Sequence, residues 1–154
     1  MNRQIKYPNT QVFTYNNVNP KNRITGDCVY RAFSLAMNKP YNEIVMELAK
    51  FHCETGYEPT YEPGKFLEKN GWVKFKQPRK LDNTKYTGEE YCKSLQVSNI
   101  NTLPNIEYDY SRIICNIGTH HVTCIINGKI NDIWNCSYKC VGNIYIRKIT
   151  QGDN

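Results

Sequence analysis

Two runs of strand-forming residues separated by a turn dipeptide make up the segment Thr119-His120-His121-Val122-Thr123-Cys124-Ile125-Ile126-Asn127-Gly128-Lys129-Ile130-Asn131-Asp132-Ile133-Trp134. Asn127-Gly128 is the strongest short-range signal for a two-residue type I′ hairpin, because both central residues of that turn need a positive φ angle. The turn also fixes the register of the two strands, with Ile125 opposite Ile130 and Thr123 opposite Asp132. We therefore predict an antiparallel hairpin over this segment.

This register predicts which side chains share a face of the hairpin. Because side chains alternate along a strand, one face carries His121, Thr123, Ile125, Ile130, Asp132 and Trp134. His121 and Asp132 are then diagonal neighbours, roughly 7–8 Å apart at the backbone and within reach of long side chains. A histidine oriented by an acid is two thirds of a catalytic triad, although such a pair is also a common structural hydrogen bond. The opposite face offers a rival set of polar groups, namely His120, Asn131 and Asn135.

Composition predicts one globular domain over residues 1–154. The chain of 154 residues is 40% hydrophobic and 22% charged, which is typical of globular proteins and not of disordered or membrane chains. No apolar run approaches the roughly 18–20 residues of a membrane span, and the segment Met1-Asn2-Arg3-Gln4-Ile5-Lys6-Tyr7-Pro8 lacks the apolar core of a signal peptide. We therefore expect a cytoplasmic protein with no membrane partner.

The seven cysteines and the net charge of +6 point to no disulfide framework and no nucleic-acid partner. An odd number of cysteines in a reducing compartment argues against closed disulfides. The basic residues are scattered and show no clustered RNA-binding signature. Four residues, namely His52, Cys53, Cys136 and Cys140, are candidate zinc ligands, but structural zinc usually takes two tight cysteine pairs. We expect neither a metal nor a cofactor.

Helix signals come before strand signals along the chain, which predicts an α+β fold. Residues 1–25 are expected to be an extended entry segment with one short strand near 11–15. Capping residues predict where three helices begin: Asp27, Asn42 and the capping box Thr87-x-x-Glu90. The predicted helices cover 28–37, 43–52, 65–69 and 87–95. Beyond the hairpin, the predicted strands cover 72–76, 111–117 and 142–149, and 96–109 is expected to be a loop.

Cys28, directly after Asp27, is the first residue of the helix predicted over 28–37, whose apolar residues predict that it is mostly buried. There the helix dipole and the free backbone amides stabilise a thiolate and lower the pKa of the cysteine. The backbone N–H of Cys28 can also hold the oxyanion of a tetrahedral intermediate. No other cysteine in the sequence has this placement, so Cys28 is the candidate nucleophile.

The order of a cysteine at a helix start, a histidine at a strand start and an acid on the next strand resembles the papain-like cysteine peptidase superfamily. More narrowly, residues 25–32 and 121–134 are similar to small bacteriophage and prophage cysteine peptidases, and the similarity spans roughly residues 15–149. The resemblance implies a papain-like domain with amino-terminal helices packed on an antiparallel sheet. It assigns Cys28 as nucleophile, His121 as general base and then acid, and Asp132 as the acid that orients the imidazole, and it favours His121 over His120.

The resemblance also implies a side-chain amide upstream of the nucleophile as a second oxyanion donor. Asn22 has the matching spacing, Asn19 is an equal candidate, and a plain loop role is the alternative for both. Arg31 belongs to the similar segment and is expected to pair with Asp27 one turn away, with a substrate carboxylate as the alternative partner. Trp134 is expected either in the core or as a lid over the imidazole.

Together these features predict a phage-encoded thiol hydrolase that cleaves an amide or isopeptide bond in a protein or peptide, such as a bacterial host protein, in the host cytoplasm. Transglutaminase-like acyl transfer and deamidation use the same thiol chemistry, and the sequence does not separate them from hydrolysis. A non-enzymatic protein that binds a host factor or nucleic acid is a further alternative.

Overall fold

The structure, a computed structural model, describes residues 2–98 and 107–149. Its helices are α1 (Arg3–Lys6), α2 (Cys28–Met37), α3 (Tyr41–Thr55), α4 (Pro63–Lys69) and α5 (Gly88–Ser98). Its strands are β1 (Phe13–Tyr15), β2 (Trp72–Phe75), β3 (Tyr108–Ile117), β4 (His121–Ile126), β5 (Lys129–Asp132) and β6 (Val141–Lys148). Within these residues, no helix has both the length and the apolar character that crossing a membrane requires.

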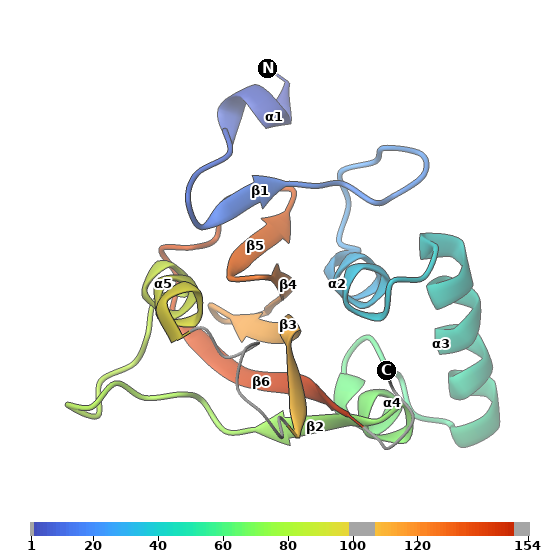
Figure 1. Cartoon of the computed structure of the whole chain (residues 1–154). Coiled ribbons are helices and arrows are strands. Elements are labelled where there is room, and N and C mark those ends of the chain that lie inside the picture. Colours follow the sequence, from blue (N-terminus) through green and yellow to red (C-terminus); the bar gives the residue numbers. More distant parts are fainter. Residues whose placement is uncertain (1, 99–106, 150–154) are drawn as a thin grey trace.

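The strands form one six-stranded sheet in the order β1-β5-β4-β3-β6-β2, and Figure 1 shows them stacked from β1 at the top to β2 at the bottom. Every neighbouring pair is antiparallel except β1 and β5, which are parallel. The α+β class is therefore confirmed, but the prediction of an antiparallel sheet is wrong at this edge. Strands joined by a tight turn must run antiparallel, whereas β1 reaches β5 from the far end of the chain and no turn fixes its direction.

The predicted hairpin forms between β4 and β5. Asn127 and Gly128 have φ angles of 48° and 75°, as a type I′ turn requires. Ile125 pairs with Ile130, and Ile126 pairs with Lys129. The turn residues and the predicted register of the hairpin are thus confirmed.

Helices cover both faces of the sheet: α5 lies on one side and α2, α3 and α4 lie on the other (Figure 1). Ile125 and Ile130 belong to the apolar cluster that includes Tyr91 and Cys92 of α5. Cys124, their neighbour of opposite parity, belongs to the cluster of α2, α3 and α4. The alternation predicted for the hairpin therefore places its two faces in two separate cores.

Several element boundaries differ from the prediction. Helix α3 begins at Tyr41 after Pro40, so Asn42 does not cap it; proline lacks a backbone N–H and is well tolerated before the first turn. The short helix α1 was not predicted. Because α5 ends at Ser98 and β3 begins at Tyr108, the predicted loop 96–109 is too long at both ends, and 99–106 lies outside the described residues.

Candidate functional site

Cys28 is the first residue of α2, and its side chain is half-buried. Helix α2 packs mainly against β4, which brings its amino end to the beginning of that strand. The Cys28 thiol lies beside the His121 side chain and the backbone of Val122, and both lower the pKa of the thiol. The first amides of a helix have no partner within the helix, so the Cys28 thiol also lies where the helix dipole favours an anion.

His121 and Asp132 form the predicted pair across the hairpin. His121 begins β4, Asp132 ends β5, and His121 Nε2 lies 2.6 Å from Asp132 Oδ2. The Asp132 side chain is 1% exposed and the His121 side chain 15%. The Trp134 ring packs beside the imidazole, with a centroid separation of 5.0 Å. The structure therefore brings Cys28, His121 and Asp132 together through His121, while His120 lies exposed beside them.

The surroundings favour opposite charges on Cys28 and His121. Burial alone raises the pKa of Cys28, but the hydrogen bonds to His121 and Val122 and the positive charges of His121 and Arg31 lower it below its ordinary value. Burial alone lowers the pKa of His121, but its hydrogen bonds to Asp132, Cys136 and Cys28 raise this pKa to about 11. A thiol of lowered pKa beside an imidazole of raised pKa favours the charged forms, thiolate and imidazolium, over the neutral pair.

The buried cysteines show the opposite shift. Burial raises the pKa of Cys92 and of Cys124 to about 12, and it also raises the pKa of Cys115 and of Cys136. Neutral thiols are poor nucleophiles, so these residues are packing groups. Cys136 is nevertheless part of the site, because its sulfur lies within 4.8 Å of a ring nitrogen of His121 and a carboxylate oxygen of Asp132. The sequence analysis missed this contact, and no spacing rule points to it.

Arg31 has the partner that the sequence predicts, Asp27, and a second partner that the sequence analysis missed, Asp132. Its Nε donates to Asp27 Oδ1 at 2.8 Å, as predicted, but its Nη1 also donates to Asp132 Oδ1 at 2.7 Å. The Asp27 side chain makes no capping bond to α2, so the predicted capping role is wrong. The Asp27 carboxylate instead accepts hydrogen bonds from Arg31, Asn19 and Tyr41.

The side chains of the two predicted oxyanion residues, Asn22 and Asn19, have hydrogen-bond partners other than Cys28. Asn22 is exposed at a φ angle of 53°, and its side-chain oxygen accepts from Asn17. Asn19 donates its amide to Asp27 Oδ2 at 3.0 Å. Neither residue lines the two depressions that Cys28 lines. In the described structure, the backbone amides at the start of α2, which have no partner within the helix, are the N–H groups next to Cys28.

Two depressions meet at Cys28, His120 and His121. The larger has a volume of about 640 Å³ and is lined with polar side chains that include Gln77, Asn116 and Asn143. The smaller, of about 400 Å³, is lined by residues that include Arg3 and Trp134. Half-buried Cys28 therefore lies where the two depressions meet.

One group of possible metal ligands occurs among the described residues: His121, Asp132 and Cys136, whose ligand atoms all lie within 4.8 Å of one another. Asp132 Oδ1 accepts from Arg31 and from the Ile133 N–H, and Oδ2 is bonded to His121. Since both carboxylate oxygens are committed, the geometry fits a hydrogen-bond network better than a metal centre. The four zinc candidates suggested by the sequence form no such group in the described ranges.

The chain was compared with family models, curated proteins and solved structures, and none of these comparisons gives a match. The functional assignment therefore depends on the residues and their geometry.

Proposed function

We propose that this protein is a thiol hydrolase that cleaves an amide or isopeptide bond with Cys28, His121 and Asp132. The observation that carries the proposal is a thiol at a helix amino terminus beside an imidazole that is itself bonded to a buried carboxylate. That arrangement contains the three roles that acyl transfer through a thiol needs: nucleophile, general acid–base and orienting acid.

In the acylation step, the Cys28 thiolate attacks the substrate carbonyl carbon. A carbon–sulfur bond forms, and the carbonyl electrons move to the oxygen, where amides at the start of α2 stabilise the oxyanion. The oxyanion then collapses and breaks the carbon–nitrogen bond, while protonated His121 gives its proton to the leaving amine. The product is a thioester on Cys28 and a free amine.

In the second step, neutral His121 takes a proton from water as the water oxygen attacks the thioester carbon. The carbon–sulfur bond breaks, and Cys28 leaves as a thiolate beside the reprotonated imidazole. Asp132 stays ionised throughout and holds the imidazole in one orientation. We propose a protein or peptide of a bacterial host as the substrate, and this part of the proposal rests on the resemblance described in the sequence analysis alone.

The proposal is tested by alkylating the folded protein with iodoacetamide at pH 6 and locating the label by mass spectrometry. A Cys28 thiolate stabilised by His121 should react at this pH, at least about tenfold faster than an ordinary thiol with a pKa of about 8.5. Cys53 is the internal reference, because it is an exposed free cysteine. Cys28→Ala should abolish the fast label and leave the circular dichroism spectrum unchanged. If Cys28 reacts no faster than Cys53, the proposal is wrong.

A further inference from the structure

Arg31 lies one turn after the nucleophile on the same helix and joins two buried carboxylates. Its side chain is 5% exposed, Asp27 is 5% exposed and Asp132 is 1% exposed. A buried charge is tolerated in a protein only where it is paired. The guanidinium supplies that pairing to both carboxylates at once, through Nε and Nη1.

The result is a continuous chain of alternating charge that ends at the thiol. It runs from Asp27 to Arg31, then to Asp132, His121 and Cys28, and each member contacts the next. The far end is anchored on α3, where the Tyr41 hydroxyl donates to Asp27 Oδ2 at 2.8 Å. Helix α2 therefore carries both Cys28 and Arg31, the cation that binds Asp132.

The two oxygens of Asp132 have different partners. Oδ1 accepts from Arg31 at 2.7 Å and from the Ile133 N–H at 2.7 Å, while Oδ2 is 2.6 Å from His121 Nε2. Holding Oδ1 in this way fixes the plane of the carboxylate, so that Oδ2 points at the imidazole. A planar, two-pronged guanidinium is suited to this task, whereas a lysine ammonium is a single point charge.

From this geometry we propose that Arg31 is a positioning residue for the thiol chemistry, which acts by keeping Asp132 ionised and aimed at His121. The inference rests on the proposed function. The other titratable and charged groups near Asp132, His121 and Cys28 are Asp27 before α2, Cys124 from β4, Cys136 after β5, and Arg3 and His120, which line the smaller depression. Among the described residues, Arg31 is the permanent cation with an ion pair to Asp132, whereas the nearby Arg3 Nε donates to the backbone oxygen of Ile133.

The experiment measures the rate of Cys28 alkylation as a function of pH in wild type, Arg31→Gln and Arg31→Lys. Without the guanidinium, Asp132 is a weaker support for protonated His121, so the thiolate forms at higher pH. We expect the acidic limb of Arg31→Gln to move up by about one pH unit, which corresponds to about a tenfold slower reaction at pH 6. Arg31→Lys keeps the charge and should recover part of the shift.

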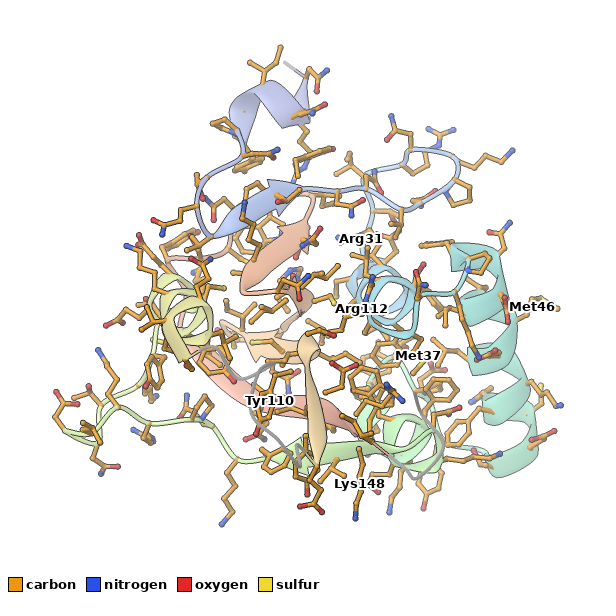
Figure 2. The ribbon with its side chains drawn as sticks, in the orientation of Figure 1. Arg31, Met37, Met46, Tyr110, Arg112 and Lys148 are labelled. Atoms are coloured by element: carbon orange, nitrogen blue, oxygen red, sulfur yellow. The ribbon has the colours of Figure 1, made fainter. Side chains whose placement is uncertain are left out.

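Arg112→Gln is the matched control. Arg112 on β3 also lies beside α2 (Figure 2), where its Nη1 donates to the backbone oxygen of Leu35 near the other end of the helix. Arg112→Gln therefore removes an arginine that contacts the same helix outside the charge chain. Its pH profile should match that of wild type.

A second comparison separates positioning through Asp132 from a merely structural role. In an Asp132→Asn background, Arg31→Gln should cause little further change in the pH profile, because the group it acts on is already gone. Equal effects of Arg31→Gln in the two backgrounds, or a wild-type profile for Arg31→Gln, would overturn the inference. If near-ultraviolet circular dichroism shows that Arg31→Gln does not fold, Arg31→Lys takes its place. Its pH profile is then compared with wild type and measured again in the Asp132→Asn background. Failure of the proposed function is recognised separately, because wild-type Cys28 would then react no faster than Cys53.

Discussion

At the residue scale, His121 receives its partners from three parts of the chain: Cys28 from α2, Asp132 from β5 and Cys136 from the segment after β5. An imidazole with so many partners has little freedom to turn, so it keeps one nitrogen toward the acid. Asp132 is in turn held by Arg31. Under the proposed function, the reactivity of Cys28 therefore depends first on His121, then on Asp132, and then on Arg31.

The dependence should weaken along this series. His121→Ala removes the cation beside the thiolate and returns the pKa of Cys28 toward its ordinary value of about 8.5. Asp132→Asn leaves the imidazole in place, so it should slow Cys28 alkylation at pH 6 less than His121→Ala does. Rates measured on both variants with intact circular dichroism test this order, and a larger effect of Asp132→Asn would contradict it.

The raised pKa of His121 also predicts a pH dependence of stability. A group whose pKa is raised by folding stabilises the fold fully below its unfolded pKa, about 6.5 for histidine, and loses this contribution as the pH rises through the folded value. In a Cys28→Ala background, the further change His121→Ala should therefore cost more unfolding free energy at pH 6 than at pH 9. Urea denaturation at the two pH values measures it, and an equal cost at both would refute the charged form of His121.

At the element scale, α5 shows how local signals fix a helix start. Thr87 and Glu90 form the predicted capping box: the Thr87 N–H donates to Glu90 Oε1 at 3.0 Å, and the Glu90 N–H donates to Thr87 Oγ1 at 3.2 Å. The next residue, Gly88, is the first of the helix and is buried against the sheet. A Cβ at Gly88 would lie 2.8 Å from Ile117 Cδ1 and 3.0 Å from the Ser137 Cα.

Gly88→Ala should therefore destabilise the protein by about 1–3 kcal/mol, the usual cost of overpacking. Chemical denaturation measures the change. Gly26→Ala is the control, because a Cβ at Gly26 would meet no atom within 4 Å. Since α5 covers the sheet face away from α2, Cys28 alkylation should persist in folded Gly88→Ala. An unchanged denaturation midpoint would contradict this prediction, because it would show that the residues around Gly88 can move to make room for the added methyl group.

At the scale of the whole molecule, the amino-terminal segment completes the sheet edge beside the site. Strand β1 pairs with β5, and the Asn16 N–H donates to the backbone oxygen of Asp132 at 2.9 Å. Arg3 Nε donates to the backbone oxygen of Ile133 at 2.8 Å. Phe13 fixes the strand in the core, with 0% exposure. The first strand of the chain thus supports the carboxyl end of β5, where Asp132 lies.

Phe13→Ala should cost about 3–5 kcal/mol of unfolding free energy, as expected for a buried phenylalanine. Because loosening β1 also removes backbone support from Asp132, Cys28 alkylation at pH 6 should slow in this variant while the protein is still folded. Ile5→Ala in the same segment is the control, since Ile5 is 71% exposed and should change neither quantity. Normal Cys28 reactivity in folded Phe13→Ala would contradict the role of β1.

Local signals in the sequence determined the hairpin, its register, the beginning of α2 and the capping box of α5. Each depends on residues a few positions apart: two positive φ angles for Asn127-Gly128, alternation along β4 and β5, and a thiol directly after Asp27. The hairpin register also predicted that His121 and Asp132 would meet. Side chains alternate along a strand, so the register places both residues on the same face of the hairpin. The placement of Cys28 at the start of α2 supplied the third member of the candidate site.

Only the tertiary structure decided the parallel pairing of β1 with β5, the second partner of Arg31 and the contact of Cys136 with His121. Each of these joins segments that no turn or helical period connects, so local spacing carries no information about them. Asp27 illustrates the difference. Its position predicts a helix cap, but its carboxylate binds the buried guanidinium of Arg31 instead of the backbone amides of α2. A charge removed from water must be paired, and that requirement outweighs a capping bond to backbone amides.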